Sequence, residues 1–251
     1  MDIRLPTGKN KIVAIGVGIA FMVIALIPQF ITQEIPTIIV LVRYGAVNLI
    51  KIMSGFELSN PILWALFIGG TAAIYQESMK YFAVNTQSKY LTIWIGLGFA
   101  LVDIAVLFIE SGSPLIRTFS WTLLVLIALN TFSSLIFHPG TALILKYGRT
   151  VRKGIYFLLF TILLHGIEDG GLVYADIYVI LHQNLYMEVI SAFCSVTICI
   201  SVAAFLMGMK YRRFVYSSKA DENTIRIKHF ATFGCDRKIR KLNGRYIFII
   251  K

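Results

Sequence analysis

Apolar stretches recur along the first 210 positions of the chain, and each is long enough to cross a bilayer as a helix of about 20 residues. Six of them are predicted to be transmembrane helices, at 12–32, 61–84, 90–109, 118–146, 154–180 and 186–209. A further apolar segment, 36–53, is short and contains Arg43 and Lys51, so it either spans the membrane, lies in the interface or re-enters. The pattern predicts an all-α fold, a polytopic membrane helix bundle of six or seven transmembrane helices, over residues 1–210.

The last segment, 211–251, has a different composition, polar at first and then basic. Asn243 and Gly244 stand between two β-prone runs, which is typical of a tight hairpin turn. We therefore expect a short basic tail after the membrane domain. Its two alternatives are a small β-hairpin and a disordered segment.

The composition agrees with a membrane protein, since 57% of the residues are hydrophobic and only 15% are charged. The formal net charge of +11 raises the alternative of nucleic-acid binding. However, many of the basic residues flank apolar spans or lie in the tail, where anionic lipid headgroups and membrane topology account for them. We therefore expect the lipid bilayer, and not nucleic acid, as the partner of these residues. The three cysteines form no metal-ligand pattern and are interpreted as free thiols.

Two basic clusters predict the topology. They are "KYGRTVRK" at 146–153 and "KYRR" at 210–213, and the link between the two spans that they flank, "LHQN", contains no Lys or Arg. Both clusters, and with them the C-terminal tail, should be cytoplasmic. The loop at 85–89 is then cytoplasmic as well, and a loop at 110–114 is outside. The N-terminus is inside with six crossings and outside with seven.

Two spans carry acidic residues that a bilayer disfavours. Glu77 and Lys80 are three positions apart and share a helix face, next to Gln76. Their structural alternative is an ion pair near a helix end, with Lys80 snorkelling to the interface. Asp103 follows Gly96, Gly98 and Ala100, which offer a surface for close helix packing, and it lies near the middle of its span. A lone buried Asp is costly there, so we expect a partner or a function for it.

Two later spans carry histidines. His138 precedes Pro139, which is expected to kink its helix, and it is either a satisfied core histidine or part of a site. His165 and Asp169 are four positions apart and lie on one helix face, with Glu168 to one side. Such a pair can orient an imidazole, share a proton or ligate a metal, or it can be a self-satisfied structural pair.

These polar residues share one depth in the predicted bundle. At a rise of ~1.5 Å per residue, counted from the expected cytoplasmic ends, they lie roughly 10 to 22 Å deep. The set consists of Glu77, Asp103, His138, His165 and Asp169. Four antiparallel helices would thus contribute to one layer in the cytoplasmic half. We expect the side chains to converge on one polar cavity that is open to the cytoplasm.

Four motifs in this order resemble the superfamily of PrsW, YhfC and CAAX-type intramembrane proteases. They are "GGTAAIYQESMKYFAV", "IGLGFALVDIAVLF", "LIFHPGTALIL" and "LLHGIEDGG", which together cover roughly 61–180 and look most like the YhfC and PrsW branches. The family pattern has Glu-x-x-Lys/Arg, a Gly-rich helix with an acid, a later His and a final His-x-x-x-Asp/Asn. The chain departs from it twice, with Gln76 where the family has a first glutamate and with Asp103 where a glutamate is usual.

The resemblance implies an intramembrane peptidase that hydrolyses a peptide bond of a membrane-embedded or lipid-anchored protein. Its catalytic residues would be Glu77, Lys80, Asp103, His138, His165 and Asp169. In this interpretation Glu77 is the general base, the two histidines polarise the carbonyl or bind a metal, and Asp169 orients His165. The requirement for a metal stays open, because Glu77, Asp103, His138 and His165 would suit Zn²⁺ but the HExxH arrangement is missing.

Two alternatives to an enzyme remain. The departures at Gln76 and Asp103 favour a catalytically inactive homologue that binds or scaffolds a partner in the membrane. Acids and histidines inside spans also occur in small proton- or ion-coupled transporters. The short chain and the lack of paired interrupted spans in corresponding halves are arguments against a transporter.

Overall fold

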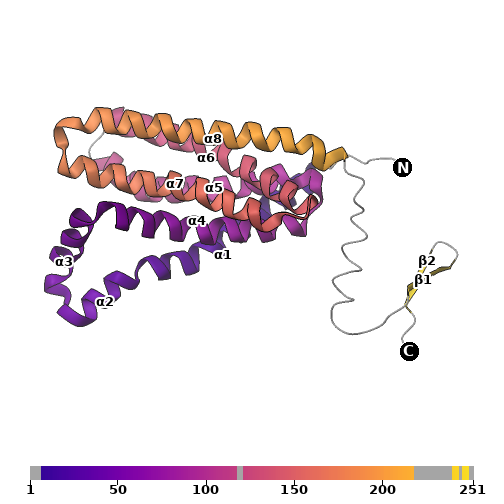
Figure 1. Cartoon of the computed structure of the whole chain (residues 1–251), viewed down its shortest axis with the longest axis horizontal. Coiled ribbons are helices and arrows are strands. Elements are labelled where there is room, and N and C mark those ends of the chain that lie inside the picture. Colours follow the sequence, from indigo (N-terminus) through magenta and orange to yellow (C-terminus); the bar gives the residue numbers. More distant parts are fainter. Residues whose placement is uncertain (1–6, 118–120, 218–238, 243–244, 249–251) are drawn as a thin grey trace. The chain divides into compact units, whose positions relative to one another are not determined.

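The computed structural model describes residues 7–117, 121–217, 239–242 and 245–248. Helices account for almost all of the first two ranges (Figure 1). They are α1 (Gly8–Gln33), α2 (Ile35–Tyr44), α3 (Ala46–Ser59), α4 (Pro61–Thr86), α5 (Thr92–Arg117), α6 (Trp121–Thr150), α7 (Gly154–Leu181) and α8 (Tyr186–Ser217), with the 3₁₀ turns η1 (Lys89–Leu91) and η2 (Gln183–Leu185). The predicted all-α polytopic bundle is confirmed.

Five helical stretches are long and apolar enough to cross a membrane by themselves. Helix α4 joins them when it is taken together with α3, from which it bends by 100°. The ambiguous segment 36–53 falls in α2 and α3, two short helices without buried residues that link α1 to α4 at the end of the bundle opposite the start of α1 (Figure 1). By length and composition, the described residues thus contain five to six membrane-spanning stretches, without a separate one at 36–53, and the chain is a multi-pass membrane protein.

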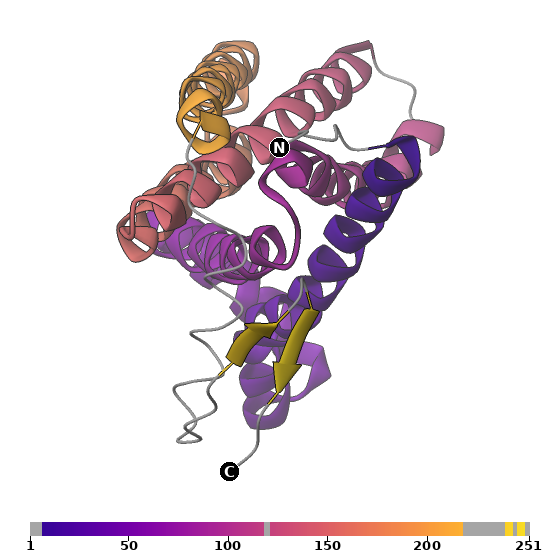
Figure 2. The ribbon, with the colours of Figure 1, turned by 90° about the vertical axis from the view of Figure 1, so that its right-hand side faces the viewer.

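The long helices alternate in direction. The start of α1 and the end of α8 therefore lie at the same end of the bundle, together with the α4–α5 and α6–α7 connections (Figure 1). We call this end the basic end, because it carries the clusters at 146–153 and 210–213. Viewed along the helices from there, α1 (indigo) and α8 (orange) lie on opposite flanks (Figure 2). The predicted loop at 110–114 is wrong, because α5 continues in helical conformation to Arg117.

Glycines let several helix pairs approach closely. A Cβ on Gly98 would collide with the backbone of α1, and one on Gly96 would collide with the backbone of α6 at Pro139. Gly69 on α4 meets Gly170 on α7 in the same way. Backbones in a membrane bundle pack closely where such small residues face each other. The close-packing surface predicted for α5 is confirmed.

The basic end of the bundle is filled by side chains. One apolar cluster joins α1, α4, α5 and α6, and its fully buried members include Met22, Val84, Ile95, Phe99 and Leu145. The rings of Tyr147 and Tyr211 stack with their centroids 4.1 Å apart, which joins α6 to α8. The Lys146 ammonium donates hydrogen bonds to the carbonyls of Val84 (2.7 Å) and Gln87 (3.0 Å) and so satisfies the end of α4.

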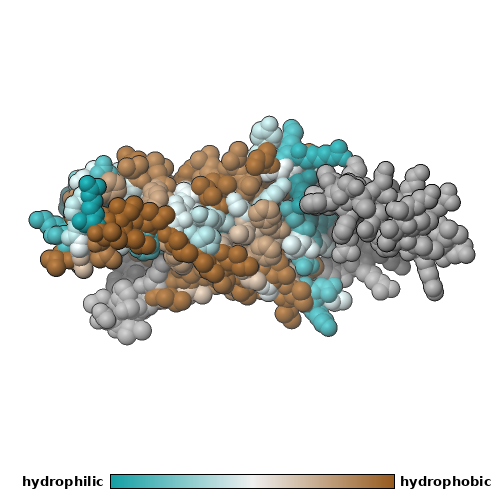
Figure 3. Space-filling model, turned by 90° about the horizontal axis from the view of Figure 1, so that it is seen from below, coloured by the Kyte–Doolittle hydropathy of each residue, from teal (hydrophilic) through white to brown (hydrophobic). Residues whose placement is uncertain are grey.

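The outer surface suits lipid. Apolar residues (brown) cover the middle of the face in Figure 3, and hydrophilic residues (teal) lie toward its two ends. Large apolar side chains are exposed on several helices, among them Leu66, Phe82, Leu163 and Leu206. Exposed apolar surface of this extent is expected where the solvent is a bilayer.

A second unit of the chain begins at Ser217. Its two described strands, β1 (Ile239–Leu242) and β2 (Arg245–Phe248), pair antiparallel, with Leu242 opposite Arg245. The predicted turn residues 243 and 244 lie outside the described residues, as does Cys235, while Cys194 and Cys199 are free thiols. Helix α8 runs to Ser217, beyond residue 210 where the sequence predicted the membrane domain to end.

Candidate active site

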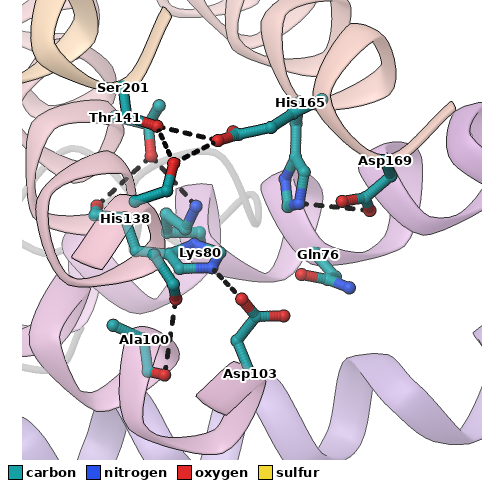
Figure 4. A network of polar contacts seen from close by, with 12 residues as sticks. Gln76, Lys80, Ala100, Asp103, His138, Thr141, His165, Asp169 and Ser201 are labelled. Carbon is teal, nitrogen blue, oxygen red and sulfur yellow. Dashed lines mark hydrogen bonds and ion pairs between the residues drawn. The ribbon is translucent and has the colours of Figure 1, made fainter. Parts of the chain in front are cut away.

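The polar residues predicted from the sequence meet in the interior of the bundle (Figure 4). His165 Nδ1 lies 2.8 Å from Glu77 Oε1, and His165 Nε2 lies 3.4 Å from Asp169 Oδ2. His138 Nε2 lies 3.5 Å from Asp103 Oδ2. The two imidazole rings are 5.4 Å apart and nearly perpendicular. The predicted convergence of these side chains is confirmed.

Glu77 and Lys80 form an ion pair that is completely shielded from solvent. The Lys80 ammonium also donates a hydrogen bond to Thr141 Oγ1 (3.0 Å) on α6. It lies over the rings of Phe99 and Phe137 at 5.4 and 5.6 Å, where the aromatic faces favour a cation. The interpretation that Lys80 snorkels to the membrane interface is wrong, because its charge is held inside the bundle.

His165 lies between two carboxylates. Its side chain is 3% exposed, whereas the Asp169 side chain is 36% exposed and Glu77 is fully buried. A neutral imidazole has one N–H and can donate to one of the two carboxylates, and an imidazolium donates to both. The histidine is thus held on one side by a buried carboxylate and contacts an accessible one on the other.

His138 is less completely satisfied. Nε2 of His138 contacts Asp103, whose side chain is 38% exposed. Nδ1 of His138 is buried and makes no hydrogen bond with the described residues. The ring packs edge-on against Phe137 at 5.6 Å. A satisfied core histidine would have a partner on each nitrogen. The unfilled Nδ1 therefore favours a role in a site over the purely structural alternative.

A cavity of about 240 Å³ adjoins these pairs. Its wall comes from α1, α4, α5, α6, α7 and α8, and its polar lining residues are Gln29, Gln33, Gln76, Asp103, Asn130, Ser133, Ser134, His138, His165, Glu168, Asp169 and Thr197. Neither Glu77 nor Lys80 belongs to this wall. The predicted polar cavity exists, and Asp103, Asp169 and both histidines line it, but the expectation that Glu77 lines it is wrong.

The cavity extends away from the basic end. On α4 it reaches back from Gln76 to Ile68, and on α7 it continues past Asp169 to Val173, toward the end at which α2 and α3 link α1 to α4. The expected opening toward the cytoplasm stays a prediction. Lys80, Phe99 and Phe137 fill the bundle on the side of the polar layer that faces the basic end.

Sequence reasoning missed Ser133, Ser201 and Gln29, and it named Glu168 and Gln76 without predicting their contacts. Glu168 accepts hydrogen bonds from the hydroxyls of Ser133 (2.8 Å) and Ser201 (2.7 Å), which connects α6, α7 and α8. Gln76 donates to Gln29 Oε1 on α1 (3.1 Å), and its own Oε1 is buried without a hydrogen bond to the described residues. The position of Glu168 next to Asp169 could have indicated that it belongs to the site. A serine in an apolar helix gives no such indication.

The geometry does not fit a metal centre built from the expected ligands. No group of three or more His, Cys, Asp or Glu in the part of the chain that the structure describes is arranged to hold a metal ion. Oε1 of Glu77 is already bound by the Lys80 ammonium and by His165, so a cation occupies the place of a metal. Asp103 and His138 form a separate pair. We therefore derive no catalytic step through zinc.

Comparisons of the chain with protein-family models, with curated proteins and with solved structures found no match. The resemblance to the PrsW, YhfC and CAAX-type proteases thus stays a prediction that depends on the four motifs.

Proposed function

We propose that the protein is an intramembrane peptidase, with a membrane-embedded or lipid-anchored protein as its substrate. The observation that supports the proposal is the position of His165, which lies in the cavity wall between two carboxylates. A buried carboxylate, Glu77, fixes its Nδ1, and its Nε2 lies toward the accessible Asp169. A base whose ring is oriented by a second group is the arrangement that activates a nucleophile in hydrolases.

In the proposed reaction His165 is the neutral imidazole that donates its Nδ1–H to Glu77, and its Nε2 takes a proton from a water molecule in the cavity. The water oxygen attacks the carbonyl carbon of the scissile amide, the C–N bond breaks, and the proton passes from the imidazole to the leaving nitrogen. His138, held by Asp103, stabilises the negative charge on the carbonyl oxygen. The ring spacing of 5.4 Å lets both histidines act on one carbonyl group.

Glu77 has a different role here from the one that the family pattern implied. It is a positioning residue, because it does not line the cavity and its Oε1 is bound by Lys80 and His165. Lys80 holds the Glu77 carboxylate in place through their ion pair.

One observation favours a second candidate, a catalytically inactive homologue that binds a membrane partner. The motif residue that lines the cavity is Gln76, an amide, whereas the neighbouring carboxylate, Glu77, is buried and does not line it. If the reaction needs a carboxylate at position 76, the chain binds a polypeptide without cleaving it.

We further propose that the basic end is cytoplasmic, which follows from the basic clusters at 146–153 and 210–213. The ends of α1 and α8 that lie there would then both face the cytoplasm. The cavity would extend into the opposite half of the membrane.

The test is cleavage by the purified chain in membranes that contain candidate substrates, with new N-termini identified by mass spectrometry. His165→Ala should lower single-turnover cleavage by on the order of 10²-fold or more, as loss of a transition-state group does, with little change in melting temperature. Glu77→Gln should lower kcat with little change in KM, because it misplaces the base without touching substrate.

The matched control is His182→Ala. His182 is exposed at the α7–α8 turn and contacts only the Tyr178 ring among the described aromatic residues, at 4.4 Å. Cleavage that survives in His165→Ala contradicts the proposed base. Capture of a membrane polypeptide without cleavage by any version of the chain supports the binding homologue instead.

A further inference from the structure

The side of the cavity formed by α6, α7 and α8 contains a carboxylate without a cationic partner. Glu168 lines the cavity and forms no ion pair with a described residue. The other three acids of the layer differ from it, since Asp103 and Asp169 each lie beside a histidine and Glu77 lies beside Lys80. Glu168 thus has a different electrostatic environment from its neighbours.

The charges around the cavity do not balance. Four carboxylates meet one lysine and two histidines, so with all four carboxylates ionised the layer would keep a negative charge even if both histidines were protonated. An ionised carboxylate inside a membrane bundle is costly unless a positive charge compensates it. Among the described residues, His165 and Lys80 act on Glu168 only from beyond ion-pair distance, and no cationic side chain forms an ion pair with it.

The hydroxyls around Glu168 show where a positive charge would fit. The Ser133 and Ser201 hydroxyls each lie within hydrogen-bond distance of Glu168 Oε1, at 2.8 and 2.7 Å, and their own oxygens are 2.5 Å apart. Three oxygens therefore crowd together, with only two hydroxyl hydrogens between them. A cation that binds the oxygen lone pairs would relieve the repulsion.

Thr197 adds a separate observation. It lies on α8 one helical turn before Ser201, is 4% exposed and lines the same cavity. Its hydroxyl is buried and makes no hydrogen bond with the described residues. Such an unsatisfied buried group costs free energy unless it binds a ligand or water. The Asn130 side chain lines the same wall.

We propose that Glu168, Ser133, Ser201 and Thr197 form a binding site for a monovalent metal cation of the size of Na⁺. Carboxylate and hydroxyl oxygens are ligands for hard cations. A single carboxylate balances a single positive charge, whereas Ca²⁺ sites use several carboxylates, so the site fits a monovalent cation. The proposal is independent of the proposed peptidase activity.

The experiment measures the melting temperature of the full-length chain in detergent against NaCl, with choline chloride at equal ionic strength as the reference. A ligand that binds only the folded state stabilises it, so Na⁺ at about ten times its Kd should raise the melting temperature by roughly 3–6 °C. Binding of ²²Na⁺ to the same protein gives the stoichiometry directly.

Glu168→Gln should abolish the Na⁺-dependent shift, because it keeps the shape of the side chain and removes its charge. Thr197→Val, which replaces only the hydroxyl, should weaken it and serves if Glu168→Gln fails to fold. The matched control is Glu188→Gln, an exposed glutamate in the first turn of α8, which should leave the shift unchanged.

A shift that choline produces equally, or that survives in both Glu168→Gln and Thr197→Val, overturns the cation site. So does a melting temperature that responds to pH but not to Na⁺ and loses this response in Glu168→Gln, because the missing hydrogen is then a proton on Glu168. None of these measurements uses a substrate, so their outcome is separate from that of the cleavage test.

Discussion

The two halves of the helical bundle use the same helices in different ways. Toward the basic end, side chains of α1, α4, α5 and α6 pack into one apolar cluster, and Lys146 ties α6 to the end of α4. Toward the other end, six helices surround a cavity of about 240 Å³ that is lined by both polar and apolar side chains. The packed half holds the helices in position, so that the polar half can keep a hollow whose side chains are prearranged.

The boundary between the halves is the pair of Glu77 and Lys80, and breaking it should have the largest effect on stability. Glu77→Ala leaves the Lys80 ammonium buried without its carboxylate, which should cost about 3–5 kcal/mol of unfolding free energy. Asp103→Asn changes a charge that is 38% exposed to the cavity and keeps its hydrogen-bonding shape, so it should cost only about 1 kcal/mol. Denaturation of both variants in the same detergent makes the comparison, and equal losses would contradict the division into halves.

Substitutions of two adjacent alanines on α4 compare the packing of the two halves, with smaller expected effects on stability. Ala73 is fully buried, and a Cβ on Gly166 of α7 would lie 3.7 Å from it, so Ala73→Leu should overpack this contact and cost about 1–3 kcal/mol. Ala72 lines the cavity, so the larger side chain in Ala72→Leu has space and should cost less than about 1 kcal/mol. Melting temperatures of the two variants decide this. A larger loss in Ala72→Leu would mean that the cavity is filled in the folded protein.

The smallest effect on stability, within about 0.5 kcal/mol, is expected for single cysteines at the exposed ends of the bundle. With Cys194, Cys199 and Cys235 replaced by serine, Arg149→Cys should resist membrane-impermeant labelling in intact cells, and His182→Cys should react.

Lys9→Cys extends this test to the start of α1. It should behave like Arg149→Cys, because six crossings place both at one end. Different labelling of Lys9→Cys and Arg149→Cys would contradict the six crossings. Labelling of both from outside would reverse the orientation.

The helices and part of the site were predictable because they depend on local spacing. Runs of apolar residues predict spans, and positions three or four apart share a helix face, which brought Glu77 to Lys80 and His165 to Asp169. The loop predicted at 110–114 was wrong because Gly112 and Pro114 are turn signals in isolation, yet the helix continues through them. At these two residues the helical conformation of the surrounding segment outweighs their turn propensity.

The remaining features depend on contacts between distant parts of the chain. Glu168 meets serines 35 and 33 positions away, and no periodicity in the sequence indicates this. The direction of the cavity depends on how Phe99 and Phe137 pack around Lys80, which spacing along one helix does not specify.

The buried Lys80 also has a consequence for how the chain enters the membrane during synthesis. Helix α4 meets the length and hydropathy limits for a span only together with α3, and it must bring both Glu77 and Lys80 into the bilayer. Charged residues at the centre of a nascent helix cost about 2.5–3.5 kcal/mol each on insertion. The histidine that completes their hydrogen bonding, His165, is synthesised 88 residues after Glu77. We therefore expect α4 to remain beside the insertion machinery until α7 emerges. In a nascent chain that stops before α7, α4 should not insert stably into the membrane.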